Sequence, residues 1–101
     1  MRILLMARMP HETFNAAVRD GSVDRKMQAI LDDIQPETVY FTEMNGLRTA
    51  LMIVDLKNPS QIPALAEPFF LTFNANVEFH VVMRPQDLQE AGLEQIGRKW
   101  A

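Results

Sequence analysis

The chain contains no cysteine among its 101 residues, and it carries only one tryptophan and one tyrosine. The absence of cysteine excludes disulfide bonds, thiolate metal ligands and cysteine nucleophiles. Basic residues are also few, since ten lysines and arginines against thirteen aspartates and glutamates leave a formal charge of −3. Because binding to a phosphate backbone needs a surplus of basic side chains, nucleic acid is not expected as a partner.

The sequence also lacks a long apolar run and the motifs of several large enzyme classes. The apolar opening, MRILLMARMP, is much shorter than a membrane span, and Arg8 interrupts it where a signal peptide would stay apolar. We therefore expect a cytoplasmic protein with no membrane partner. The chain has no glycine-rich phosphate loop, no Gly-x-Ser-x-Gly elbow and no Cys/His ligand cluster, so nucleotide-dependent transfer, serine-type hydrolysis and structural zinc are unsupported. No cofactor is predicted.

Apolar residues make up 48% of the chain, which suffices for one hydrophobic core, while the length is too short for two ordinary domains. We expect a single domain over residues 1–101. Residues 1–9 are apolar at both even and odd positions, which is typical of a strand covered on both faces. Residues 11–34 then carry apolar side chains at helical spacing, with a break at Gly21, which can end a first helix, and Ser22, which can cap a second.

The clearest local signal is a β-hairpin centred on Asn45-Gly46. The flanking runs VYFTEM and LRTALMIVDL are β-prone, and the Asn-Gly dipeptide suits a two-residue type I′ turn. With these two residues in the turn, the opposing pairs are Glu43 and Arg48, Thr42 and Thr49, Tyr40 and Leu51, and Val39 and Met52.

Three further elements are expected in the second half of the chain. A helix is predicted from the capping sequence at 58–61 to Phe73, with a kink or restart at Pro68. Residues 76–84 alternate between apolar and polar side chains, which indicates a fourth strand. From Pro85 onward, acidic residues come early and basic residues late, as suits the dipole of a C-terminal helix that its two glycines weaken.

The order strand–helix–strand–strand–helix–strand favours an α+β fold of the ferredoxin-like βαββαβ type, with an extra C-terminal helix. Both central helical segments would then cover one face of the sheet. The other face would carry the side chains of Leu4, Met6, Leu51, Ile53 and Val82 beside those of Arg8, Tyr40, Thr42, Thr49 and His80.

The apolar side chains of this second face need a cover. At ~100 Å² for each of the five, their burial is worth on the order of 12 kcal/mol as an upper bound. A domain of this size is typically stable by only ~5–15 kcal/mol, so such an area would hardly stay in water. A twofold axis makes one patch complementary to itself, and we therefore expect a homodimer that associates through its sheets.

Glu78 and His80 are the first pair of candidate site residues. They are two apart on a predicted strand and so share a face, where the carboxylate can orient the imidazole for proton transfer near neutral pH. The alternative is a polar strand face without a function. A metal site is not expected, because His11 is the only other histidine and lies at a helix start.

Tyr40 is the second candidate, and it shares its predicted face with Thr42 and Thr49. Its hydroxyl can donate to the carbonyl or phenolate of a ligand in a mostly apolar cavity. Alternatively, it is a dimer-core tyrosine whose hydroxyl bonds to the backbone. Arg8 can hold a ligand carboxylate in a bidentate pair, or it can pair with Glu78 or Glu43.

Four segments of the chain resemble an uncharacterised bacterial group of small dimeric α+β-barrel proteins. They are MRILLMARMP, VYFTEMNGLRTALMIVDL, PSQIPALAEPFF and VEFHVVMRPQDLQEAGL, and together they span nearly the whole chain. In that superfamily two ferredoxin-like subunits enclose a barrel, and its members include cofactor-free monooxygenases, muconolactone isomerase-like enzymes and haem-degrading proteins. The resemblance implies the fold and the dimer rather than one reaction.

Two functions therefore stand side by side. In the first, the dimer binds a small apolar or aromatic molecule, with His80 and Tyr40 as candidate catalytic groups for cofactor-free isomerisation or oxidation. Arg8, Thr42, Thr49 and Glu78 would then contact the substrate. In the second, the protein is a non-catalytic interaction or scaffold dimer whose interface is filled by its own side chains. An enclosed pocket that receives the Tyr40 hydroxyl and a His80 nitrogen would favour the first.

Overall fold

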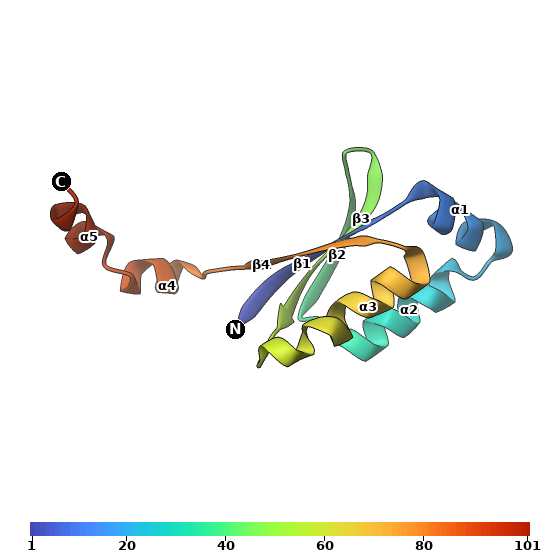
Figure 1. Cartoon of the computed structure of the whole chain (residues 1–101), viewed down its shortest axis with the longest axis horizontal. Coiled ribbons are helices and arrows are strands. Elements are labelled where there is room, and N and C mark those ends of the chain that lie inside the picture. Colours follow the sequence, from blue (N-terminus) through green and yellow to red (C-terminus); the bar gives the residue numbers. More distant parts are fainter.

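A four-stranded antiparallel sheet with helices on one of its faces forms the body of the molecule, in a computed structural model that describes residues 1–101 (Figure 1). The elements are β1 (Arg2–Met9), α1 (His11–Asp20), α2 (Val23–Ile34), β2 (Thr38–Met44), β3 (Leu47–Asp55), a 3-10 turn (Pro59–Gln61), α3 (Ile62–Phe73), β4 (Asn76–Val81), α4 (Pro85–Glu90) and α5 (Leu93–Lys99). The prediction of an α+β chain is confirmed. No helix has the length and apolar character needed to cross a membrane.

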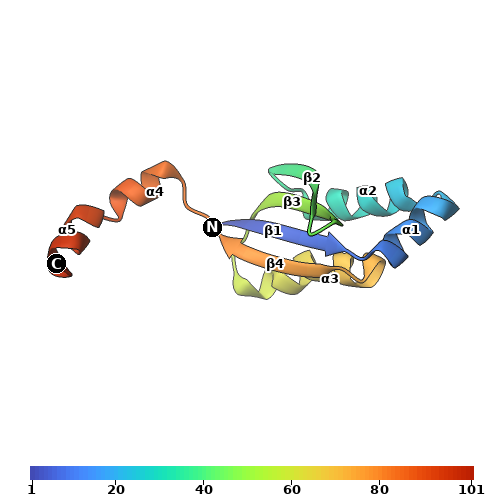
Figure 2. The same cartoon turned by 90° about the horizontal axis from the view of Figure 1, so that it is seen from above.

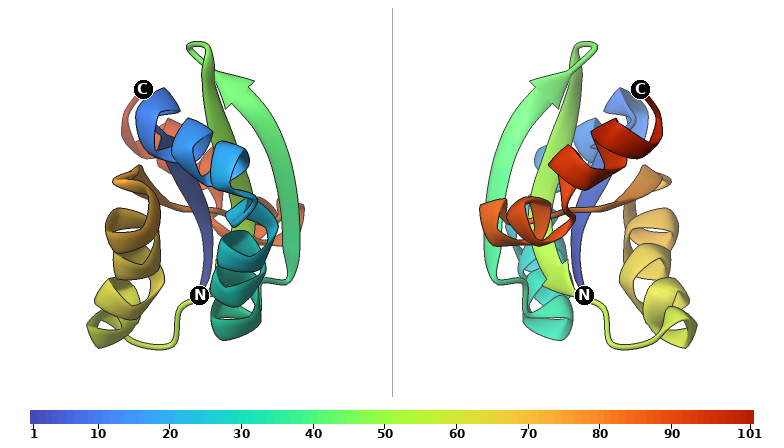
Figure 3. Two further views of the ribbon diagram at one scale, coloured as in Figure 1. Left: turned by 90° about the vertical axis from the view of Figure 1, so that its right-hand side faces the viewer. Right: turned by 90° about the vertical axis from the view of Figure 1, so that its left-hand side faces the viewer.

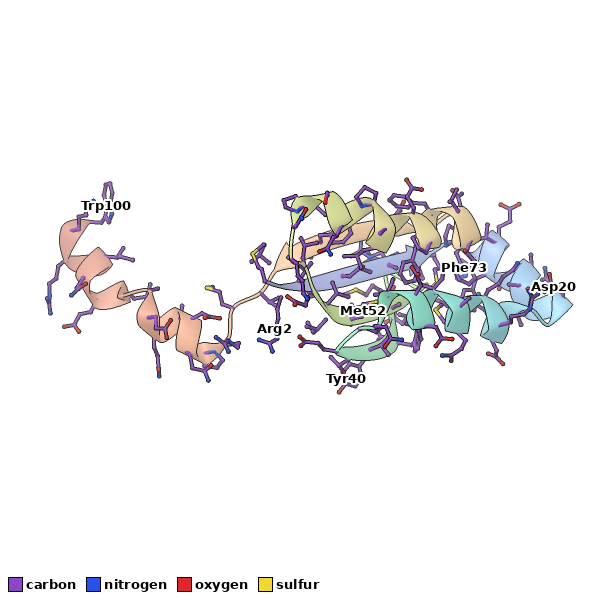
Figure 4. The ribbon with its side chains drawn as sticks, turned by 90° about the horizontal axis from the view of Figure 1, so that it is seen from below. Arg2, Asp20, Tyr40, Met52, Phe73 and Trp100 are labelled. Carbon is purple, nitrogen blue, oxygen red and sulfur yellow. The ribbon has the colours of Figure 1, made fainter.

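The strands follow one another across the sheet in the order β2-β3-β1-β4, and every neighbouring pair is antiparallel. Seen from below, α2 and α3 lie in front of the strands (Figure 4). Seen from above, β1 and β4 have no helix in front of them (Figure 2). The helices of the body therefore cover one face of the sheet, as expected, and leave the other face open.

The core lies between the sheet and these helices. The odd positions of β1 from Ile3 to Met9 are buried, and so are the alternate positions Ala50, Met52 and Val54 of β3. Phe69 and Phe73 of α3 are fully buried against them. This alternation along the strands, with helical spacing on α3, produces a single core cluster.

The hairpin of β2 and β3 has the predicted turn and register. Asn45 and Gly46 both have positive φ angles, of 54° and 77°, as a type I′ turn requires. All four predicted opposing pairs are present. The expected charge pair between Glu43 and Arg48 is not formed, because Arg48 Nη1 donates to Asn15 Oδ1 at 2.7 Å and its guanidinium lies over the ring of Phe14.

The break in the first helical layer is also confirmed, although the predicted cap is not. Gly21 ends α1 with a φ of 80°, a conformation that glycine adopts without strain. Ser22 makes no side-chain cap bond, and its buried hydroxyl has no partner. Instead, the Ser22 backbone N–H donates to Asp20 Oδ1 at 2.8 Å. Asp20 therefore accepts from the N–H of the N-cap residue itself, and the first-turn N–H groups of α2 have no side-chain cap.

The second half of the chain follows the sequence prediction at the capped turn and departs from it at the end of the fourth strand. Asn58 caps the turn before α3 as expected, by accepting from the Ser60 N–H at 2.9 Å, and α3 runs through Pro68 to Phe73 without restarting. The fourth strand ends at Val81 rather than at residue 84. It ends there because β1 begins at Arg2, whose carbonyl accepts from the Val82 N–H and is the last partner available.

The predicted C-terminal helix is divided into α4 and α5. Gly92, with a φ of 72°, separates them, and both project away from the body along its long axis (Figures 1 and 2). We call residues 83–101 the C-terminal arm. None of its residues is buried. The arm extends the molecule to 59 Å along its longest axis and raises the radius of gyration to 17.1 Å, against about 13 Å for a compact chain of this length.

Candidate functional site

The open sheet face is the face of the sheet that no helix covers. It is defined by the strand register and by the alternation of side chains along each strand. Its side chains are Leu4, Met6 and Arg8 of β1, Thr38, Tyr40 and Thr42 of β2, Thr49, Leu51 and Ile53 of β3, and Glu78 and His80 of β4. The apolar side chains lie on the two central strands, and the polar ones lie mainly on the outer strands and toward one end.

Glu78 forms an ion cluster with Arg8 and His80 on this face. Its Oε2 atom is 2.8 Å from Arg8 Nη1, and its Oε1 atom is 3.4 Å from His80 Nε2. The two strands β1 and β4 pair so that Glu78 lies beside Met6 and His80 beside Leu4. The predicted pairing of Glu78 with His80 is therefore present, and of the two partners that the sequence left open for Arg8, Glu78 and Glu43, the structure contains Glu78.

Arg8 keeps one unpaired donor within this cluster. Its Nε atom is out of contact with solvent and has no hydrogen-bond partner. A buried guanidinium N–H without an acceptor is costly, so an additional acceptor at this position would be stabilising. Because this atom is shielded from solvent, an oxygen atom of another molecule can reach it only if the surrounding side chains move.

Tyr40 and the two threonines occupy the other half of the open sheet face. Tyr40 is 68% exposed on the edge strand β2, and it makes no hydrogen bond within the chain through its hydroxyl (Figure 4). Thr42 is exposed and lies opposite Thr49, as predicted. Thr49 is buried, and its hydroxyl already donates to the Leu47 carbonyl at 2.9 Å. Tyr40 and Thr42 therefore have hydroxyls free for a ligand, while the Thr49 hydroxyl can only accept.

The two predicted catalytic residues are far apart within one chain. Tyr40 lies on β2 and His80 on β4, which are the two outer strands of the sheet. Three strand spacings separate them, about 14 Å. A single subunit therefore brings together Arg8, Glu78 and His80, but it does not bring Tyr40 to them.

The cavities of the single chain lie elsewhere. The largest, of about 350 Å³, lies between α2 and α3 beside Ile30 and Pro68. A second, of about 310 Å³, lies where the arm leaves the body, between Arg2 and Arg84. A third, of about 210 Å³, lies beside Ile34 and Leu65. None of the three is lined by a predicted site residue, and no three His, Asp or Glu side chains are grouped to hold a metal ion.

A second group of charged residues, which sequence reasoning missed, surrounds the start of β1. Arg2 Nε donates to Glu37 Oε2 at 2.9 Å, and this hydrogen bond with the charge of Glu37 raises the pKa of Arg2. The N-terminal ammonium donates to Asp55 Oδ1 at 3.0 Å, and this bond and charge lower the pKa of Asp55. Arg2 and Glu37 are 35 positions apart in the chain, and Met1 and Asp55 are 54 apart, so no local sequence pattern predicts these pairs.

The same end of the sheet fixes the first turn of the arm. The Arg84 backbone N–H donates to Asp87 Oδ2 at 2.9 Å, and this bond, together with the Arg84 side chain, lowers the pKa of Asp87. Asp87 thereby supplies an acceptor for an N–H at the start of α4. The bond from the Val82 N–H to the Arg2 carbonyl is the last one between β4 and β1 before the arm begins.

Comparison with known protein families found no family model that matches the chain, and comparison with curated proteins found no matching relative.

Proposed function

We propose that the chain is one subunit of a cytoplasmic, ferredoxin-like homodimer, in which two open sheet faces meet and enclose a site for a small apolar or aromatic molecule. The strand order β2-β3-β1-β4 and the helices confined to one sheet face support the ferredoxin-like assignment. The resemblance to dimeric α+β-barrel proteins supports the association through the sheets. The single observation that carries the proposal is an ion cluster of Arg8, Glu78 and His80 beside apolar side chains on an uncovered sheet face.

The apolar part of the open sheet face supports burial in a dimer. Leu4, Met6, Leu51 and Ile53 lie next to one another on the paired strands β1 and β3. In a single chain Met6 is already buried and Leu4, Leu51 and Ile53 are half-buried, so a cover would remove only their remaining apolar area from water, at about 25 cal/mol per Å². A second copy of the same face offers a matching apolar centre.

In a dimer with a twofold axis parallel to the central strands, Tyr40 of one subunit would lie close to His80 of the other. Such an axis places β2 of one subunit over β4 of the other, because it reverses the strand order from side to side while the two faces meet. Tyr40 would then face Glu78 and His80 of the partner subunit. The dimer would contain two equivalent sites, each of them built from both chains.

The chemistry of such a site suits proton transfer next to a carbonyl group. The His80 imidazole, oriented by Glu78, would accept a proton from the carbon beside the carbonyl and return it to another carbon of the same molecule. The Tyr40 hydroxyl would donate a hydrogen bond to the carbonyl oxygen as charge gathers there. This isomerisation needs no cofactor, and Arg8 would hold a carboxylate of the substrate.

The second candidate function is a non-catalytic scaffold dimer with a filled interface. It is favoured by one observation, namely that Glu78 satisfies both Arg8 and His80 within one chain. Native mass spectrometry of protein purified from its source separates the two candidates. A dimer that carries a retained small organic molecule supports the binding function, and a dimer without one under repeated preparation contradicts it.

A further inference from the structure

The C-terminal arm presents an apolar stripe that nothing in the chain covers. Its members are Leu88 of α4, Leu93 and Ile96 of α5, and Trp100, and between 46% and 77% of each is exposed. Charged and polar residues are frequent at the other positions of the two helices, and Glu94 and Arg98 form an ion pair on α5. The arm therefore has the amphipathic pattern of helices that pack against a partner surface.

The helices of the arm are too short to be stable by themselves. Isolated helices below ~12–15 residues are marginal in water even with favourable sequences. The two helices here have six and seven residues, and the glycine between them adds no helical stability. Their order therefore depends on packing of the apolar stripe against another surface.

The accessible surface area of the chain is larger than that of a compact monomer. A compact monomer of this mass exposes about 5,800 Å². This chain exposes 7033 Å² at a mass of 11.6 kDa, an excess of about 1,200 Å² over the compact value. A standard protein–protein interface buries about 800 Å² on each partner, so this excess, to which the extended arm contributes, is more than one subunit of a stable dimer needs to cover.

The place where the arm leaves the body keeps its apolar stripe from packing against its own chain. The arm continues the direction of β4 beyond the end of the sheet (Figures 1 and 2), and its first turn is held by Arg84 and Asp87. It therefore points away from its own sheet and its own helices. Figure 3 shows that the arm emerges at the end of the molecule where β1 begins, opposite to α1.

We propose that the arms of two copies pack against each other through their apolar stripes. They would close one end of the space that the two open sheet faces enclose in the proposed dimer, which we call the chamber. This inference rests on the proposed function, because a twofold axis parallel to the strands is what makes both arms leave the dimer at the same end. The four short helices then bury Leu93, Ile96 and Trp100 of both chains. The site is closed to solvent at that end only when both arms are in place.

The absence of native cysteine allows a direct test by crosslinking. Gln95→Cys places a single thiol beside the apolar stripe of α5, and Ala16→Cys places a matched single thiol on exposed α1 at the other end of the molecule. A short bis-maleimide should link Gln95→Cys chains into covalent dimers at least about tenfold faster than Ala16→Cys chains, because paired arms hold the thiols at a high effective concentration. Equal rates for the two variants, with dimer mass retained, would overturn the pairing of the arms.

Trp100 provides a second, independent readout, since it is the only tryptophan of the chain. Its emission should be blue-shifted in the full-length dimer and should move to that of exposed indole in the double variant Leu93→Asp/Ile96→Asp. Light scattering on the same samples separates the two proposals. A dimer with exposed Trp100 emission contradicts the arm pairing alone, whereas a monomer contradicts the dimer and the arm pairing together.

Discussion

Arg8 and Glu78 lie on neighbouring strands of the open sheet face and form an ion pair of 2.8 Å, to which His80 adds a second contact on the same carboxylate. The pair links the centre of the sheet to its β4 edge. It also leaves the buried Arg8 Nε without an acceptor, which reduces the stability that the pair contributes.

Replacement of Glu78 by glutamine tests the ion cluster. Glu78→Gln removes the counter-charge of Arg8 while it keeps the shape of the side chain. Because both partners are partly exposed, with 27% and 40% of their side chains accessible, the loss of unfolding free energy should be at most about 1 kcal/mol. Urea denaturation measures it, with Glu90→Gln on the arm as a control that should not change stability. A gain in stability in Glu78→Gln would show that the cluster is not a favourable pair.

Removal of the polar groups that face the chamber tests the ligand site. Tyr40→Phe and His80→Ala should each weaken binding of a captured ligand by ~1–2 kcal/mol, about 5- to 30-fold, because each removes one hydrogen bond. Isothermal titration calorimetry measures the affinity, and His11→Ala serves as the matched control because that histidine lies on α1, outside the site. Unchanged affinity in both site variants would remove Tyr40 and His80 from the binding function.

A charge on the open sheet face tests the dimer interface. Leu51→Glu should shift the protein from dimer to monomer, because an unpaired carboxylate is costly to bury among apolar side chains. The matched control is Leu71→Glu on α3, where the side chain is 83% exposed and outside the proposed interface. Sedimentation velocity measures both. If Leu51→Glu sediments as a dimer like the control, the two sheets do not meet at this face.

Acid titration tests the charges at the start of β1. The pKa of Asp55 is lowered by the N-terminal ammonium, so the folded state holds this carboxylate ionised more strongly than the unfolded state does. The stability it contributes is fully present above the unfolded pKa of about 3.9, and it is lost as pH falls through the lower folded pKa. Asp55→Asn should therefore flatten the fall in unfolding free energy below pH 4. Asp24→Asn, on an exposed position of α2, should keep the full slope. Equal slopes in the two variants would contradict the pairing.

The sequence predicted the parts of the fold that depend on local chemistry. The hairpin register follows from Asn45-Gly46, because the turn type sets which residues oppose one another. The end of α1 follows from Gly21 for a similar reason. The pairing of Glu78 with His80 was predictable because residues two apart on a strand share a face.

The remaining features depend on contacts between distant parts of the chain. Arg48 contacts Asn15 and Phe14 of α1, more than thirty positions earlier in the chain. The residue pattern of the strand does not predict these contacts. The end of β4 at Val81 depends on where β1 begins. The direction in which the C-terminal arm leaves the body is not contained in the helical periodicity of its sequence.

The mass of the protein in dilute solution tests the central claim most directly. Size-exclusion chromatography with light scattering at micromolar concentration should give twice the 11.6 kDa mass of the chain, because the proposed dimer covers both the open sheet face and the arm with a second copy. A mass of one chain, with circular dichroism showing folded structure, would contradict the shared chamber and the paired arms.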